Sequence, residues 1–155
     1  MFLTDPGMVP ICDKPDLIWL DGPLVWQDPN RGIIRIPAGF ISDDASTPRF
    51  LDWIPFLDRQ GLSRRPGLLH DGVYALGRVK GKDWCDELLR DACIAEGMTA
   101  REAWCYYQGV HLFGQSSYDA DAKEGVYGAI ESGDFYTEKD FNNWVADGAT
   151  VFRTA

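Results

Sequence analysis

The sequence lacks long apolar runs and an excess of positive charge. None of its apolar segments approaches the ~20 residues that a membrane-spanning helix needs. The formal net charge of the 155 residues is -9 at pH 7, and such a chain repels a phosphate backbone. The N-terminal residues lack the basic and then apolar layout of a signal peptide. We therefore expect no transmembrane segment, no nucleic-acid partner, and a protein that is made in the cytoplasm.

The four cysteines include no C-x-x-C pair. Cys85 and Cys93 lie eight residues apart on one predicted helix, about 12 Å by helical rise, which is too far for a disulfide. A zinc site would need partners at spacings that the sequence does not have. We expect buried free thiols.

Basic residues are few, and the densest group of them falls in the middle of the chain. Such a group can face an acidic partner or an anionic lipid surface, but a solvated loop is the simpler interpretation. The residues are Arg59, Arg64, Arg65, Arg78, Lys80 and Lys82.

Length and composition are those of one folded α+β domain. Hydrophobic residues make up 45% of the chain and aromatic residues 13%, which is enough for a packed core. We predict a single domain over 1–155, with a motif-bearing core over about 33–114 and a C-terminal extension over about 115–155. No internal repeat is seen.

The first forty residues predict a small antiparallel β-meander. Strong turn signals separate three short apolar segments, at 17–20, 24–27 and 33–36. A polar turn rich in specific side chains follows. Three packed helices are predicted after it: one from about Pro66 to Leu76, one over 82–96 with Gly97 as its C-terminal cap, and one behind Thr99 to about Phe113.

The third predicted helix begins with a capping box, in which Thr99 is followed by Glu102. Apolar residues surround it almost completely, so we expect it to be largely buried, with its aromatic side chains in the core rather than on a binding surface. The aromatic residues are Trp104, Tyr106, Tyr107 and Phe113. A further short helix is predicted to begin near Thr137.

Candidate catalytic residues come from the first two helices. On a helical wheel, His70 and Tyr74 lie about 40° apart, on a polar strip beside the apolar face. Asp86 lies at the rim of the apolar arc of the second helix at a similar height, so a hydrogen bond between His70 and Asp86 is geometrically reasonable. That bond would fix the imidazole tautomer and leave the other ring nitrogen to act as a general base. Asp71 is placed to hold a hard cation.

Each of these residues also has a purely structural interpretation. A His–Asp pair between packed helices is often a satisfied polar pair of the core. His111, on the apolar third helix, is expected to be structural. Asp43 and Ser46 either form an Asx-turn or an N-cap that organises the loop before Pro48, or line the site. Arg49 is a further candidate for lining the site.

Three motifs in order resemble a family of unknown function that is common in tailed-phage and prophage genomes. They are Ile36-Pro37-Ala38-Gly39-Phe40-Ile41-Ser42-Asp43-Asp44-Ala45-Ser46-Thr47-Pro48-Arg49, then His70-Asp71-Gly72-Val73-Tyr74 with Asp86, then Leu112-Phe113-Gly114. The resemblance implies a viral origin and synthesis in the host cytoplasm, with possible association with the virion. It names no reaction.

A fainter resemblance is to the phospholipase A2 superfamily, whose active-site helix carries His-Asp-x-x-Tyr. His70, Asp71 and Tyr74 match that spacing, and Cys85-Asp86 is similar to the Cys-Asp of the next helix. The resemblance implies that His70 activates water, that Asp86 orients His70 with support from Tyr74, and that Asp71 ligates calcium.

Two functions from different classes follow as hypotheses. The first is a phage-encoded hydrolase-like domain that acts on an ester or another cell-envelope substrate. The second is a virion or tail-assembly protein that docks on other phage structural proteins, in which the same polar cluster only holds the helices together. An inhibitor of a host defence protein is a third possibility that rests on no motif.

Overall fold

The computed structural model describes residues 1–11, 14–36, 38, 40–42, 61–75 and 81–124. Strands come first and helices follow, so the predicted α+β class with an N-terminal antiparallel β region is confirmed. The elements are β1 (Met8–Ile11), β2 (Lys14–Leu20), β3 (Leu24–Asp28), β4 (Gly32–Ile36), β5 (Ile41–Ser42), α1 (Arg64–Ala75), α2 (Lys82–Glu96), α3 (Ala100–Phe113) and α4 (Gln115–Glu124).

The strands form two sheets instead of one continuous meander. β3 and β4 make the predicted hairpin, whereas β2 lies between β1 and β5 in a three-stranded sheet and does not pair with β3. The turn after β2 explains the difference, because its first residue bonds back to the segment before β1. The amide of Asp21 donates to the carbonyl of Gly7 at 3.0 Å, and the amide of Gly7 donates to Asp21 Oδ1 at 2.6 Å. The sequence did not predict β1 or β5.

A buried aspartate organises the turn of the β3–β4 hairpin. Asp28 Oδ1 accepts from the amides of Asn30 and Arg31, both at 2.9 Å, and Asp28 Oδ2 accepts from the indole of Trp26 and the guanidinium of Arg31. The same guanidinium donates to Asp91 on α2 at 2.8 Å. Arg31 thus ties the hairpin to the helices.

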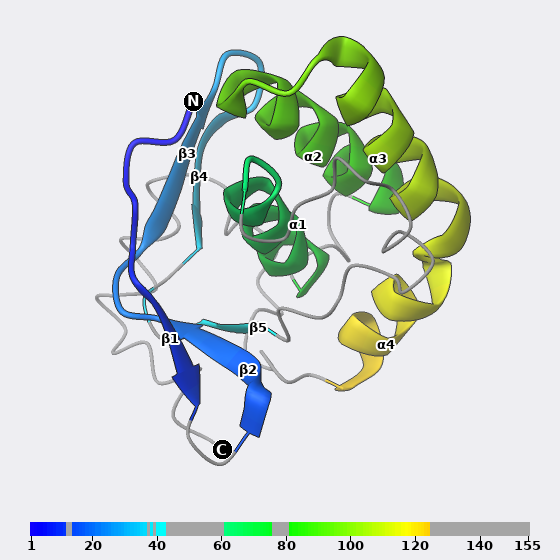
Figure 1. Ribbon diagram of the computed structural model, residues 1–155. Coiled ribbons are helices and arrows are strands. Elements are labelled where there is room, and N and C mark those ends of the chain that lie inside the picture. Colours follow the sequence, from blue (N-terminus) through cyan, green and yellow to red (C-terminus); the bar gives the residue numbers. More distant parts are fainter. Residues whose placement is uncertain (12–13, 37, 39, 43–60, 76–80, 125–155) are drawn as a thin grey trace.

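Helix α1 occupies the centre of the molecule, with the β3–β4 hairpin on one side and α2 and α3 on the other (Figure 1). Its approach to β4 is close at Gly72. A Cβ atom added there would lie 2.4 Å from Cδ1 of Ile36, so a side chain larger than hydrogen does not fit without a shift. Gly72 therefore allows the helix to pack directly on the strand.

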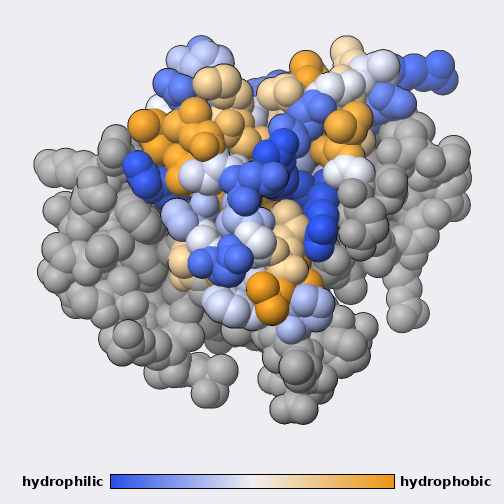
Figure 2. Space-filling view, turned by 60° about the vertical axis from the view of Figure 1, so that its left-hand side comes forward, coloured by the Kyte–Doolittle hydropathy of each residue, from blue (hydrophilic) through white to orange (hydrophobic). Residues whose placement is uncertain are grey.

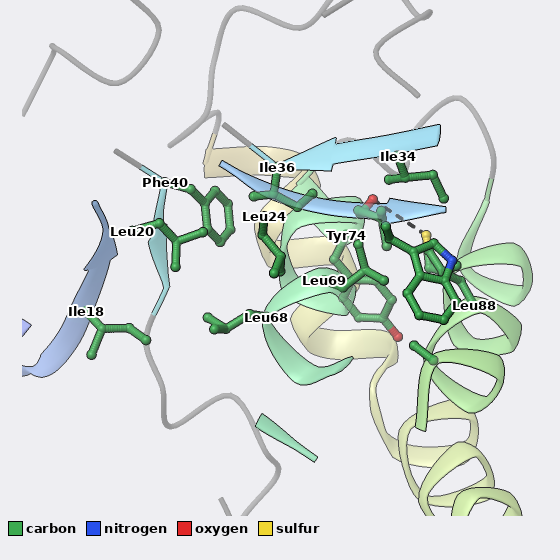
Figure 3. Packing of buried hydrophobic residues seen from close by; sticks show 14 residues of the cluster. Ile18, Leu20, Leu24, Ile34, Ile36, Phe40, Leu68, Leu69, Tyr74 and Leu88 are labelled. Atoms are coloured by element: carbon green, nitrogen blue, oxygen red, sulfur yellow. Dashed lines mark hydrogen bonds between the residues drawn. The ribbon is translucent and has the colours of Figure 1, made fainter. Parts of the chain in front are cut away.

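The larger core lies between the strands, α1 and α2, and a smaller one lies between α2 and α3. Figure 3 shows apolar side chains of the strands, such as Leu24 and Ile36, facing Leu68 and Leu69 of α1. The buried residues of the larger core are Ile18, Leu20, Leu24, Trp26, Ile34, Ile36, Phe40, Leu68, Leu69, Val73, Tyr74, Cys85, Leu88 and Ala92. Those of the smaller core are Leu89, Cys93, Met98, Ala103, Tyr106 and Val110.

The helix ends follow the sequence signals closely. Helix α2 has the predicted bounds, and Gly97 ends it in the left-handed conformation at φ 108°. The capping box of α3 is present, with Glu102 Oε2 accepting from the amide of Thr99 at 2.8 Å. Cys85 and Cys93 are buried free thiols, as predicted, and Cys105 is a partly buried one.

The expectation that α3 is largely buried was wrong. Trp104, Leu112 and Phe113 are 55%, 64% and 59% exposed, whereas Tyr106 belongs to the smaller core. Among the described elements, α2 and α4 contact α3 closely, and they do not surround it. Helix α4 was not predicted, and the helix expected near Thr137 falls outside the described residues.

The described surface is mixed in character. On the face shown in Figure 2, hydrophilic residues run between separate apolar areas. Within the described ranges, none of the helices combines the length and the apolar character that crossing a membrane requires.

Candidate functional site

Four side chains from three helices meet at the fully buried carboxylate of Asp86. With Asp86 they make five residues that we call the Asp86 cluster: His70, Tyr74, Lys82, Asp86 and His111. Helix α1 brings two of them to the same oxygen of Asp86. His70 Nε2 lies 3.0 Å from Oδ1, and the Tyr74 hydroxyl donates to Oδ1 at 2.7 Å. The spacing of four residues places both side chains on one face of α1. The hydrogen bond expected between His70 and Asp86 is therefore present.

The other oxygen of Asp86 serves α2 and α3. Lys82, one turn before Asp86 on α2, donates from Nζ to Oδ2 at 2.6 Å. His111 on α3 places Nδ1 3.2 Å from Oδ2. A carboxylate has about four lone-pair sites, and these four donors fill them.

This environment keeps Asp86 ionised. Burial would raise the pKa of the Asp86 carboxyl, but hydrogen bonds from His70, Lys82 and Tyr74 outweigh burial and lower the pKa to about 2. An ionised carboxylate only accepts hydrogen bonds, so both histidines must donate to it. His70 therefore carries its proton on Nε2 and a lone pair on Nδ1.

Neutral His70 is also favoured by its surroundings. Burial lowers the pKa of His70 below its ordinary value of 6.5, and the positive charge of Lys82 acts in the same direction against the raising effect of Asp86. Asp71 Oδ1 lies 4.0 Å from Nδ1. A neutral imidazole with a lone pair on Nδ1 has the form that a general base requires.

Asp71 lies at the edge of the cluster and is partly exposed. Its Oδ2 accepts from the hydroxyl of Ser42, the last residue of β5, at 2.7 Å. Within the described ranges, no group of three or more His, Cys, Asp or Glu residues could hold a metal ion. The described residues therefore do not make a complete calcium site around Asp71.

Asp43, Ser46 and Arg49, the candidate site-lining residues, lie outside the described residues. The structure thus places His70, Tyr74 and Asp86 together, with Asp71 beside them.

Sequence reasoning missed two members of the cluster. Lys82 was placed at the start of a predicted helix but was grouped with a solvated basic stretch, whereas its side chain is only 9% exposed. Its spacing of four residues from Asp86 was a signal for an ion pair. His111 was assigned a structural role without a partner. Because the short connection between α2 and α3 makes them antiparallel neighbours, the end of α3 had to lie beside the beginning of α2.

A comparison with known protein families assigns the chain to one of them. Its residues 18–110 match the model of a family described as protein of unknown function (DUF1353). The match covers more than half of the chain, so the protein belongs to this family, which has no assigned reaction. It includes every member of the Asp86 cluster except His111. No curated protein and no solved structure matched the chain.

Proposed function

We propose that the protein is a phage-encoded hydrolase-like domain in which His70 activates a water molecule or a hydroxyl group for attack on an ester or another cell-envelope substrate. The observation that carries the proposal is the His70–Asp86 hydrogen bond of 3.0 Å, made through Nε2, which leaves Nδ1 as the basic nitrogen. The resemblance of His70-Asp71-x-x-Tyr74 to the phospholipase A2 motif supports the same assignment.

The proposed roles follow from the contacts. His70 Nδ1 accepts a proton from the nucleophile, and Asp86 stabilises the imidazolium that forms. Tyr74 donates to the same oxygen as His70 and so keeps that oxygen in place at 2.7 Å. Asp71 is the proposed ligand for a hard cation such as calcium, whose chemistry would be to polarise the substrate's carbonyl oxygen.

The test is a panel of chromogenic acyl esters and phospholipid vesicles, assayed with calcium and with a chelator. His70→Gln should lower any cleavage by about 100-fold or more, since a general base contributes about 10²–10⁴. His111→Gln, which also removes an imidazole from Asp86, should cause a smaller loss. Equal rates for the wild type and His70→Gln would reject His70 as the base. Absence of cleavage across the panel would reject these substrate classes.

A second candidate function is supported by the exposed apolar residues of α3. Trp104, Leu112 and Phe113 offer apolar surface that would suit docking in a virion or tail structure. In this proposal the Asp86 cluster only holds α1, α2 and α3 together, and the partners are other phage structural proteins.

Gradient-purified virions of the phage that carries the gene would test the second candidate. The protein should migrate with intact particles, and Trp104→Ser should weaken that association while the melting temperature stays unchanged. A protein that remains in the soluble lysate fraction, made in the host cytoplasm and not assembled, would reject the assembly function.

A further inference from the structure

His70 is almost completely buried, although a general base has to meet its substrate. Its side chain is 7% exposed, whereas the side chain of His111, the other histidine of the chain, is 35% exposed. The carboxylate of Asp86 between them is fully buried. Some part of the protein must therefore move before a substrate reaches His70.

A row of three aromatic rings leads from His70 to helix α4. The ring of Tyr74 lies beside that of His70, with 3.9 Å between the two centroids. The ring of Tyr118 on α4 meets the ring of Tyr74 edge-on, with 5.1 Å between the centroids. Tyr74 itself is only 3% exposed, and Tyr118 is the outer ring of the row. Helix α4 therefore covers the Asp86 cluster on the side of Tyr74.

Gly114 allows α4 to lie this close to Tyr74. It stands between the last residue of α3 and the first residue of α4, which turns back from the end of α3 toward α1 (Figure 1). A Cβ atom added at Gly114 would lie 3.1 Å from the Tyr74 hydroxyl, which is a tight contact. A single glycine between two helices is also a position at which the chain can change direction readily. These properties account for the glycine of the Leu112-Phe113-Gly114 motif.

Helix α4 is held to the rest of the protein by little apolar surface. Its ten residues are polar apart from Tyr118 and two alanines. Among the described side chains of α4, Tyr118 alone packs against a core, and it does so while partly buried. Helices α1, α2 and α3 each supply several buried side chains to the two cores. Because elements with few buried apolar contacts open most readily, α4 should be the first of the four helices to detach.

We propose that α4 is a lid over the Asp86 cluster, hinged at Gly114 and held shut by the ring of Tyr118, and that its opening controls access to His70. The meaning of the lid for catalysis rests on the proposed function. The opening of α4 and the access to His70 that follows are both measurable without a substrate.

The experiment measures how fast diethyl pyrocarbonate, which acylates imidazole nitrogens, modifies each histidine of the full-length protein. Peptide mass spectrometry separates the two rates, so the exposed His111 serves as an internal reference. In Tyr118→Ser the rate at His70 should rise by about 2- to 10-fold, the effect of losing one edge-to-face ring pair, and the rate at His111 should stay the same. Trp104→Ser, which removes an exposed ring from α3, should change neither rate.

Hydrogen exchange in the same proteins identifies the helix that moves. The hydrogen-bonded amides of α4 should exchange faster than those of α2 and α3 in the wild type, and faster still in Tyr118→Ser. Protection of α4 equal to that of α3 would overturn the proposal of a lid. Faster exchange of α4 together with an unchanged rate at His70 would overturn its control of access.

If Tyr118→Ser does not fold, the wild-type protein provides the decision. Below the unfolding transition, the rate at His70 should depend only weakly on urea, because the opening of one helix exposes little surface. A dependence as steep as that of global unfolding would show that His70 is reached only when the whole protein unfolds, and the proposal would fail. A panel of esters that are not cleaved would reject the proposed function and leave these rates unaffected.

Discussion

Within the part of the chain that the structure describes, two buried aspartates each accept four hydrogen bonds, and their donors come from different distances along the sequence. Asp28 takes its donors from residues two or three positions away in one hairpin turn. Asp86 takes its donors from three helices, at sequence separations between 4 and 25. A carboxylate whose donors are close in sequence shapes a single turn. A carboxylate whose donors come from several helices forms its hydrogen bonds only when those helices are packed, and the hydrogen bonds then stabilise that packing.

The largest expected effect comes from removing each carboxylate in turn. Asp86→Ala leaves the buried ammonium of Lys82 without its counter-charge and should lower the free energy of unfolding by about 3–5 kcal/mol. Asp28→Ala leaves turn donors that water can reach more readily and should cost roughly 1–3 kcal/mol. Urea unfolding of both variants, with exposed Asp119→Ala as the control, measures the difference. An equal or larger cost for Asp28→Ala would contradict the contrast.

The second largest expected effect is the loss of stability at low pH, which should depend more on Asp86 than on Asp28. The pKa of Asp86 is about 2 in the folded protein and 3.8 is its ordinary value, so the unfolded chain binds the proton more readily. The contribution of Asp86 to stability is therefore complete above pH 3.8 and is lost as the pH drops toward 2, by on the order of 2 kcal/mol. The lowered pKa of His70 acts in the same direction and begins to cost stability as the pH falls below 6.5.

Unfolding measured between pH 7 and pH 2 tests this dependence. Asp86→Asn should flatten the acid part of the curve more than Asp28→Asn does, although hydrogen bonds also lower the pKa of Asp28 against the opposing effect of burial. Stability that rises on acidification would show that the sign is wrong.

A comparable effect on stability is expected where α1 packs on β4, between the hairpin that contains Asp28 and the helices that surround Asp86. In Gly72→Ala the new methyl group would meet Ile36 at 2.4 Å, and such overpacking costs typically about 1–3 kcal/mol. Gly67→Ala is the matched control on the same helix, because its Cβ would lie 3.6 Å from the Tyr106 hydroxyl, an ordinary contact. That variant should be stabilised by up to about 1 kcal/mol through helix propensity. Thermal unfolding of both variants gives their melting temperatures. A higher melting temperature for Gly72→Ala than for Gly67→Ala would contradict this packing.

The smallest effect concerns the rim of the Asp86 cluster. If Asp71 ligates calcium, a calcium concentration equal to the dissociation constant should stabilise the protein by about 0.4 kcal/mol, with larger shifts at higher concentration. Asp71→Asn should remove the shift in melting temperature, and Asp119→Asn should not. A shift that persists in Asp71→Asn would place the ion elsewhere.

The helices could be predicted well because their signals are local. The bounds of α2, the left-handed Gly97 and the capping box of α3 depend on residues within a turn of each other. The pairing of β2 with β5 joins residues more than twenty positions apart, and β1, the other neighbour of β2, was not recognised as a strand. Periodicity therefore placed β2 but not its neighbours. The exposure of Trp104 was missed for a similar reason, because an apolar pattern does not reveal whether a partner element covers it.

The members of the candidate site also differ in whether local sequence or tertiary packing brings them together. Helical spacing was enough to bring His70 and Tyr74 to one face and to direct Asp86 toward them. Lys82 pairs with Asp86 at a spacing of four residues within α2, but its contacts with the carbonyls of α3 depend on tertiary packing. His111 became a member only through the antiparallel packing of α2 and α3, which places the last turn of one helix beside the first turn of the other. Their roles required the tertiary structure.

The outer strand β1 has a consequence for how the protein meets other chains. In the three-stranded sheet β1 is an edge, and its third residue is Pro10, with a shift of register just after it. Proline has no amide hydrogen, and irregular edges are poor templates for a further strand. We therefore expect this sheet to resist edge-to-edge growth into aggregates, even though Val9 and Trp19 are exposed upon it.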